Sequence, residues 1–407
     1  MDRFGRREIR EFFVTASCLG VVLVFLWVER LLLARSTGRV PLRICVTGSR
    51  GKSRVVRLIA ACLKDSRMPV LAKTTGSKPC LFMPDGEEIE IRRRGHPTIL
   101  EAKKILKVAA GAGAGALVLE MMSIRPETLF VESARMIRPH ILVITNNRLD
   151  HVEEMGKTKE EIARSFASAI PKRGAVILPR EEFYPVFEKK AAKAGAELIL
   201  APPDPPAEAH LREEGIPAWE FEQNYRVALA VAGYLGLDRD RAWEAMRQSS
   251  PDFGGLRIWS VGRGFPAGEW YFVSAFGAND PESAGDVLVK LEARGLFEGR
   301  KKIGLFNWRK DRGGRTMQWF DALQNEEAYD FDRLIFVGDH APALRNRLKK
   351  RIKAEVAVFE EDKPEELIAR ITALEKGEAV VLGMGNMGGM GRKLVEYWER
   401  TGIGYDG

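Results

Sequence analysis

Apolar and polar positions divide the chain into an apolar beginning and a long remainder of mixed composition. The beginning holds 17 consecutive uncharged residues, from Phe12 to Val28. Roughly 17–25 such residues are needed to cross a bilayer as a helix, and this run is apolar on every side rather than along one stripe. The pattern therefore predicts a membrane-spanning helix in an N-terminal segment, residues 1–38.

Two other interpretations of this segment compete with a retained anchor. A signal peptide also begins with basic residues, but no small-x-small cleavage site follows the apolar run. A buried core helix is less favoured, because the run is apolar on all faces and precedes the first predicted strand. Arginines lie on both sides of the run, so the positive-inside rule gives no orientation: they are Arg3, Arg6, Arg7 and Arg10 before it, and Arg30, Arg35, Arg39 and Arg43 after it.

Beyond residue 38, short apolar runs typical of buried strands alternate with helical patterns, which predicts an α/β domain over residues 39–250. A Pro84-Asp85-Gly86 turn between two apolar stretches predicts a hairpin. The predicted strands are 42–47, 70–73, 116–120, 140–145, 175–178 and 197–200, and the predicted helices are 53–65, 98–110, 159–170, 181–194, 223–236 and 239–248.

A cluster of proline and glycine at Pro251–Gly255 marks a hinge. The alternation then starts again, which predicts a C-terminal Rossmann-like α/β domain over residues 251–407, with a mostly parallel sheet and helices on both faces. Its predicted strands are 270–275, 302–306, 333–337, 355–359 and 379–382, and its predicted helices are 282–294, 316–323, 341–350, 364–375 and 389–399.

Composition narrows the class of protein. The chain has 407 residues, 45% hydrophobic, with 64 Lys+Arg against 56 Asp+Glu, which excludes a wholly disordered chain and a disulfide-stapled miniprotein. The net charge of +8 is spread along the sequence and does not predict a nucleic-acid partner. None of the four cysteines forms a CxxC pair, so we expect no zinc site and a reducing compartment.

The segment 46–53, Val-Thr-Gly-Ser-Arg-Gly-Lys-Ser, lies between a predicted strand and a predicted helix. Glycines let backbone N–H groups surround phosphate, Lys52 reaches the β- and γ-phosphates, and the Ser53 hydroxyl is suited to Mg²⁺. Val46 stands where the general P-loop pattern has glycine, so the match is to the shorter TGxxGKS form. The predicted nucleotide-binding residues are Thr47, Gly48, Ser49, Arg50, Gly51, Lys52 and Ser53.

Two further strand ends carry polar residues. Glu120 ends an apolar strand, and a carboxylate at the carboxyl end of a parallel strand is placed to hold Mg²⁺ near the γ-phosphate. Asp150 and His151 follow another strand. His151 is either a third metal ligand beside Ser53 and Glu120 or a structural histidine with satisfied partners.

Together, strand–TGxxGKS–helix, a strand-end glutamate and a strand followed by Asp-His resemble the Mur ligases and folylpolyglutamate synthases, the ATP-dependent amide-bond ligases. This resemblance implies that Asn224 contacts adenine and that Arg257, after the hinge, contacts phosphate. Within the superfamily the chain is most similar to the catalytic subunits of poly-γ-glutamate synthase, the PgsB/CapB type. The motifs that carry this similarity are Lys73–Gly76, Phe276–Asp280, Arg309–Arg312 and Gly383–Asn386.

The resemblance implies an ADP-forming ligase that adds glutamate through γ-amide bonds to a polyglutamate chain, with ATP and Mg²⁺ as cofactors. ATP first phosphorylates a carboxylate, and an amine attacks the resulting acyl phosphate. Asp280 and Arg312 would approach the substrate when the C-terminal domain closes. We expect the protein to be a single-pass protein of the cell membrane, with its catalytic part on the cytoplasmic side. Its expected partners are small membrane subunits.

Two segments depart from the family pattern. Many Mur ligases bind a second Mg²⁺ through a carbamylated lysine on the helix after Asp-His, but residues 160–170 contain no lysine. Whether this chain binds a second Mg²⁺ is therefore an open question. Arg92, Arg93 and Arg94 match no family motif. They are either a solvated basic face or, with Arg54 and Arg57, a track that retains a polyanionic product.

Two alternative functions remain. A γ-glutamyl ligase acting on a small folate-like acceptor would use the same chemistry, although a soluble acceptor needs no membrane segment. A nucleotide-switched membrane scaffold would bind ATP without ligation. The combination of Glu120, His151 and Arg257 argues against the scaffold, because a switch needs no acyl-phosphate site.

Overall fold

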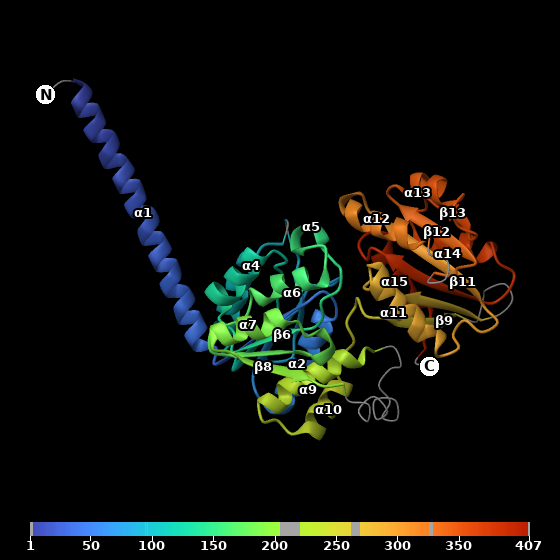
Figure 1. Cartoon of the computed structure of the whole chain (residues 1–407), viewed down its shortest axis with the longest axis horizontal. Coiled ribbons are helices and arrows are strands. Elements are labelled where there is room, and N and C mark those ends of the chain that lie inside the picture. The colour runs from blue at the N-terminus through green and yellow to red at the C-terminus, as the bar shows by residue number, and fades with distance from the viewer. Residues whose placement is uncertain are drawn as a thin grey trace.

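The computed structural model describes residues 3–93, 95, 97–203, 220–261, 269–324 and 329–405. The first element is one long helix, α1 (Arg3–Arg39), which projects away from the rest of the molecule (Figure 1). Its stretch Arg10–Arg39 is the one helix of the described chain that is long and apolar enough to cross a membrane; its apolar window has a mean hydropathy of 2.2 and is not buried. The predicted N-terminal helix is therefore present and continues almost to the first strand.

The first body is built on an eight-stranded sheet with the order β4-β3-β2-β5-β1-β6-β7-β8. All pairs are parallel except those of β3 and β4, which form the predicted hairpin. The strands are β1 (Leu42–Thr47), β2 (Val70–Lys73), β3 (Cys80–Phe82), β4 (Glu88–Glu90), β5 (Ala116–Glu120), β6 (Ile141–Ile144), β7 (Ala175–Pro179) and β8 (Glu197–Ala201).

Alternate side chains of β1 enter two separate cores, because successive residues of a strand point to opposite faces. Ile44 and Val46 pack with one set of helices, whereas Cys45 packs with the other. The first set is α2 (Lys52–Asp65), α9 (Glu222–Tyr234) and α10 (Arg239–Arg247), and the second is α3 (Leu100–Gly111), α6 (Lys159–Ala167) and α7 (Pro185–Ala194).

The second body repeats this layering around a seven-stranded sheet with the order β13-β12-β11-β14-β10-β9-β15. As predicted, most pairs are parallel, and helices cover both faces (Figure 1). The strands are β9 (Arg257–Val261), β10 (Trp270–Ser274), β11 (Lys301–Trp308), β12 (Arg333–Gly338), β13 (Glu355–Val358), β14 (Ala379–Gly385) and β15 (Ile403–Gly404). The helices are α11 (Pro281–Glu292), α12 (Gly313–Ala322), α13 (Ala341–Leu348), α14 (Pro364–Ala373) and α15 (Met390–Thr401).

Some elements differ from the prediction. The antiparallel strand β9, which lies between β10 and β15, begins at Arg257, directly after the hinge. A helical stretch, α4 (Pro126–Phe130) and its π-helical continuation (Val131–Ile137), precedes β6, and a short helix, α5 (Val152–Met155), follows it. The π-helical segment buries Glu132, which accepts hydrogen bonds from the Ser123 backbone and hydroxyl. A buried carboxylate interrupts the apolar period and hides such a helix from pattern analysis.

Candidate functional site

The TGxxGKS loop lies between β1 and α2, where the first sheet's connections change direction. This is the position at which open α/β sheets bind ligands. Gly48 and Gly51 have φ angles of 126° and 78°. A Cβ at Gly48 would lie 2.1 Å from the Thr145 Oγ1 atom, and one at Gly51 would lie 2.3 Å from Asn224 Oδ1. Both positions therefore require glycine, for conformation and for space.

Asn224 and Thr47 support the loop from two sides. Asn224, buried at the start of α9, packs against Gly51. Thr47, the last residue of β1, is buried and accepts a hydrogen bond from the Thr145 backbone through its carbonyl. Ser49 donates from its hydroxyl to the Arg148 carbonyl at 2.9 Å. The loop is thus held by the chain that follows β6.

Lys52 starts α2 and bends back over the loop. Its Nζ donates to the carbonyl oxygens of Gly48, at 2.6 Å, and Ser49, at 3.1 Å. Burial lowers the pKa of Lys52, partly offset by the charge of Glu120. A lysine cation held against a glycine-rich loop in this way is suited to contact a polyphosphate.

Ser53 and Glu120 meet, as the sequence predicts. The Ser53 hydroxyl donates to Glu120 Oε2 at 2.7 Å, and the same oxygen accepts from the Thr75 backbone at 2.7 Å. A hydroxyl and a carboxylate fit Mg²⁺, which takes oxygen ligands and usually keeps waters or phosphate oxygens for the remaining positions. Within the described residues no group of three or more His, Cys, Asp or Glu is arranged for a metal.

Asp150 occupies the centre of the contact between the two bodies, a place that the sequence did not reveal. Its Oδ2 lies 3.1 Å from Arg50 Nη2, and its Oδ1 accepts from Arg315 of α12 at 2.9 Å. Burial alone would raise the pKa of Asp150, but the charges of Arg50, His151 and Arg315 hold it well below its usual range. Asp150 is therefore a carboxylate anion shared by two arginines.

His151 lies beside this cluster rather than in the Ser53–Glu120 contact. Its backbone is left-handed, with φ 50°, and its Nε2 is 3.7 Å from Asp150 Oδ2. Burial lowers the pKa of His151, which the charge of Asp150 partly offsets. His151 is not among the residues that line the cavity described next.

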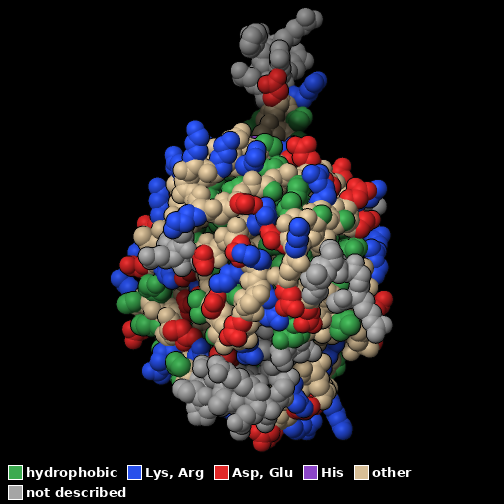
Figure 2. Space-filling view, turned by 90° about the vertical axis from the view of Figure 1, so that its right-hand side faces the viewer, with side chains coloured by type: hydrophobic (Ala, Val, Ile, Leu, Met, Phe, Trp, Pro, Cys, Tyr) green, Lys and Arg blue, Asp and Glu red, His purple; other side chains and the backbone are tan. Residues whose placement is uncertain are grey.

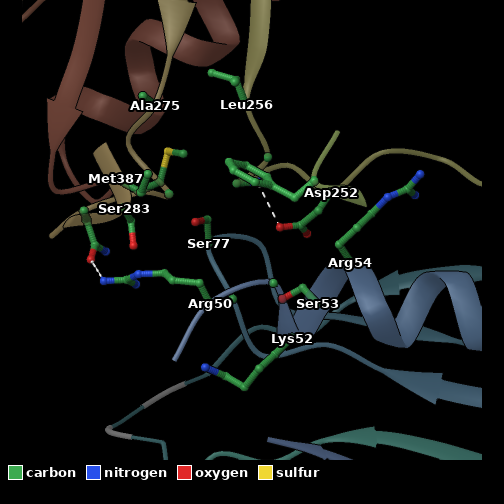
Figure 3. A pocket seen from close by; sticks show the side chains of 18 of the residues that line it. Arg50, Lys52, Ser53, Arg54, Ser77, Asp252, Leu256, Ala275, Ser283 and Met387 are labelled. Atoms are coloured by element: carbon green, nitrogen blue, oxygen red, sulfur yellow. Dashed lines mark hydrogen bonds between the residues drawn. The ribbon is translucent and has the colours of Figure 1, made fainter. Parts of the chain in front are cut away.

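A cavity of about 500 Å³ lies between the carboxyl-end loops of the two sheets. One wall is the nucleotide loop with Glu120 and Asn224, and the other is formed by the hinge and the loops after β10, β11 and β14. In Figure 3, Lys52 and Ser53 lie on the first side, and Ser283 and Met387 lie on the second. The C-terminal motifs singled out in the sequence therefore face the nucleotide loop.

The remaining predicted residues lie in different places. Asp280 is buried, with its Oδ1 capping α11 through the Ser283 N–H and its Oδ2 accepting from Arg50 at 2.8 Å. Arg257, at the start of β9, donates to Glu399 at 2.9 Å and does not line the cavity. The side chain of Arg312 lies outside the described residues.

The charged residues that line the cavity include several to which the sequence analysis gave no role, among them Arg309, Arg315 and Asp252. Burial and the charge of Glu120 raise the pKa of Asp252 to about 6. Arg309 belongs to the Arg-Lys-Asp-Arg motif and Asp252 to the hinge motif. Their positions in these motifs are the sequence signal that could have identified them. Arg315 follows two glycines and had no recognisable signal.

Of the five arginines considered as a track, Arg93, Arg54 and Arg57 are engaged within the fold, whereas Arg92 is exposed. Arg93 donates to Glu101 at 2.8 and 3.0 Å, and Arg54 is buried beside Glu220 at 2.9 Å. Arg57 is buried over the Phe82 ring, 4.5 Å from its centroid, and Arg94 lies outside the described residues. Figure 2 shows basic and acidic side chains interspersed over the face that it displays.

Comparisons with known proteins agree with this architecture. Residues 46–232 match the family model "Mur ligase middle domain", and residues 263–401 match "Poly-gamma-glutamate synthase CapB C-terminal domain". The chain is 29% identical to the capsule biosynthesis protein CapB of Bacillus anthracis, over 97% of this chain and 84% of that protein. It is also 29% identical to the PGA synthase CapB of Bacillus subtilis (strain 168), over 92% of this chain and 95% of that protein.

A solved structure shares the fold at low sequence identity. The bifunctional folylpolyglutamate synthase/dihydrofolate synthase of Yersinia pestis superposes with a TM-score of 0.67 at 14% identity, over 91% of this chain and 92% of that one. The two family-model matches confirm the family resemblance seen in the motifs: the chain combines a region similar to the Mur ligase middle domain with a region similar to the CapB C-terminal domain.

Proposed function

We propose that the protein is an ATP-dependent, ADP-forming amide ligase that joins glutamate through γ-amide bonds into poly-γ-glutamate. The observation that carries this proposal is the single cavity in which Lys52, Ser53 and Glu120 face the C-terminal motifs of the second body. The names of the two CapB relatives support the product, and the folylpolyglutamate synthase structure, complexed with AMPPNP and Mn, supports ATP and a divalent metal.

The residues of the cavity suit phosphoryl transfer to a carboxylate. Lys52 and the loop N–H groups bind and orient the phosphates, so the transition-state charge is met by groups already in place. Ser53 and Glu120 would hold Mg²⁺, which supplies charge neutralisation on the phosphates. The two bodies form two walls of the cavity, and their closer approach around bound substrate would limit the access of water to the acyl phosphate.

Several finer assignments belong to this proposal. The roles of Asn224 in adenine contact and of Asp280 and Arg312 near substrate follow from family resemblance. Arg257 would have to leave Glu399 to reach phosphate, and His151 would have to turn toward the acyl phosphate.

The arrangement of the protein in the cell is also inferred. The division into an anchor of residues 1–38, a ligase domain of 39–250 and a C-terminal domain of 251–407 follows the two sheets. ATP is supplied in the cytoplasm, so we place the catalytic part there, with α1 in the membrane and small membrane subunits as partners.

The test is ADP release by the full chain in detergent micelles, with glutamate, with a folate-like acceptor, or with neither. Release that depends on glutamate, together with a polymeric product, supports the proposal. Release only with the folate-like acceptor favours a small-acceptor ligase. ATP binding without release under any of these conditions would favour the scaffold and overturn the proposal.

A further inference from the structure

Among the charged side chains that join the two bodies, two groups around the nucleotide loop and α11 differ in exposure. The buried group comprises Arg50 and Asp150 of the first body and Asp280 and Arg315 of the second, with side-chain exposures of 20%, 9%, 1% and 11%. The rim group comprises Arg148 and Lys159 of the first body and Glu282 and Asp286 of the second, with exposures of 22%, 44%, 31% and 45%.

Arg50 is the member of the buried group that belongs to the nucleotide loop. Its Nε donates to Asp280 Oδ2 at 2.8 Å, and its Nη2 lies 2.7 Å from the same oxygen. Nη2 also lies 3.1 Å from Asp150 and donates to Asn279. Figure 3 shows the Arg50 side chain extending from the loop toward the second body. The Arg50 guanidinium thus extends beyond the nucleotide loop and contacts the second body.

The charges of this group compensate one another. Asp280 is almost fully buried and Asp150 nearly so, and a buried carboxylate is strongly unfavourable without a paired cation. Arg50 is the cation shared by both carboxylates, whereas Arg315 pairs with Asp150 from the opposite side. Separation of the two bodies would leave Asp280 without Arg50 and Asp150 without Arg315.

We propose that Arg50 is a positioning residue that ties the nucleotide loop to the second body and holds the two bodies closed over the cavity. In this role Arg50 does not bind phosphate, because its Nε and Nη2 are committed to Asp280, Asp150 and Asn279. Lys52, two residues further along the loop, remains the phosphate cation. The proposal goes beyond the ligase function, since it concerns closure and not the substrate.

The proposal predicts that loss of Arg50 affects turnover but not nucleotide affinity, whereas loss of a residue that binds phosphate would lower both. Loss of Arg50 should leave nucleotide affinity nearly unchanged, because the loop glycines and Lys52 stay in place. Turnover should fall, because a displacement of about 1 Å of the reacting groups costs on the order of 10²-fold in rate.

The experiment measures the distance between the bodies with spin labels in a Cys18→Ser background, at Lys189→Cys of α7 and Lys350→Cys beyond α13, both exposed. Arg50→Ala, Arg50→Lys and Asp280→Asn are compared with the rim control Lys159→Ala. Asparagine retains the cap of α11, so Asp280→Asn removes only the charge. AMPPNP affinity and glutamate-dependent kcat are measured on the same proteins.

We expect Arg50→Ala and Asp280→Asn to broaden the interbody distance distribution and to lower kcat about 10²-fold, with the AMPPNP Kd changed less than about threefold. Arg50→Lys should recover part of kcat, and Lys159→Ala should resemble the parent. An Arg50→Ala protein with an unchanged distance distribution, or with AMPPNP affinity lost about tenfold or more, would overturn the proposal. The distance and affinity measurements need no turnover, so they test closure even if glutamate proves not to be the substrate.

Discussion

Lys52 and Ser53 stand side by side at the start of α2 but face different partners. Lys52 turns back to the loop carbonyls, whereas Ser53 turns toward Glu120 at the end of β5. Two adjacent residues therefore present a cation and a hydroxyl to the same cavity. Successive residues of an α-helix point about 100° apart, which accounts for this divergence.

Substitution of Lys52 by alanine should reduce ADP formation at least about 10²-fold while the fold stays intact, because the lost contact is to phosphate rather than to the core. The matched control is Lys64→Ala, an exposed lysine in the last turn of the same helix. Rates of ADP release and melting temperatures distinguish the two. Near-normal ADP release by a folded Lys52→Ala protein would contradict the P-loop assignment.

Glu120→Gln should raise the Mg²⁺ concentration needed for half-maximal activity by about tenfold, since the variant keeps the side-chain shape and loses one negative charge. The glutamine oxygen still accepts from Ser53 and from the Thr75 backbone, so the melting temperature should hardly move. A Mg²⁺ titration of ADP release provides the measurement. An unshifted midpoint would remove Glu120 from the metal site.

Asp252 should make stability fall as pH rises from about 4 to about 6. Burial raises its pKa from 3.8 to about 6, so in this window the folded chain binds more protons than the unfolded chain. Asp252→Asn cannot titrate, and it should gain stability over the parent above pH 6, on the order of 3 kcal/mol at most. Melting temperatures of both proteins at pH 4.5 and pH 7.5, without Mg²⁺, check this. A difference that is the same at both pH values would refute it.

Among the elements, α1 has two parts with different surroundings. Its apolar part is exposed along its length, but near its end Glu29 pairs with Lys103 of α3 at 2.7 Å, and Leu33 packs against the first body's core. Arg43 donates to the carbonyl oxygens of Thr37 and Val40. The last turns of α1 are thus part of the folded body.

Removal of residues 1–28 should therefore give a soluble chain with nearly unchanged melting temperature and AMPPNP affinity. Removal of residues 1–38 should keep AMPPNP binding but lower the melting temperature by several degrees, because Leu33 and the Arg43 acceptor at Thr37 are lost. Scanning calorimetry of the two truncated chains is the comparison. Equal melting temperatures would show that the docked turns of α1 contribute nothing.

Strand and helix periodicity predicted most elements, because the central parallel strands are continuous apolar runs and their helices have one apolar face. It failed at β9, an antiparallel strand in which Arg257 and Ser260 interrupt the apolar run, and at α4, where Glu132 is buried nearby. Local motifs gave the nucleotide loop and Glu120. The Asp150–Arg315 contact joins residues far apart in sequence, and no local pattern records such a pairing.

At the scale of the whole molecule, the orientation across the membrane is open to a direct test. With ATP supplied from the cytoplasm, cysteine-reactive labels and proteases should reach exposed sites after Arg39 only from the cytoplasmic side. Lys189→Cys is a suitable labelling site, since it is exposed on α7. Spheroplasts and inverted vesicles give the two accessibilities. Labelling of this cysteine in intact spheroplasts by an impermeant reagent would contradict the proposed orientation.

The direct passage of α1 into the first body has a mechanical consequence. Only Val40 and Pro41 separate its last residue, Arg39, from β1, and its final turns are docked on α3. A flexible tether would let an enzyme tumble above the bilayer, whereas a continuous helix transmits its tilt to whatever is fused to it. With α1 in the membrane, as proposed, the mouth of the cavity would keep a fixed orientation relative to the lipid plane, and the growing polymer would leave the enzyme in a constant direction.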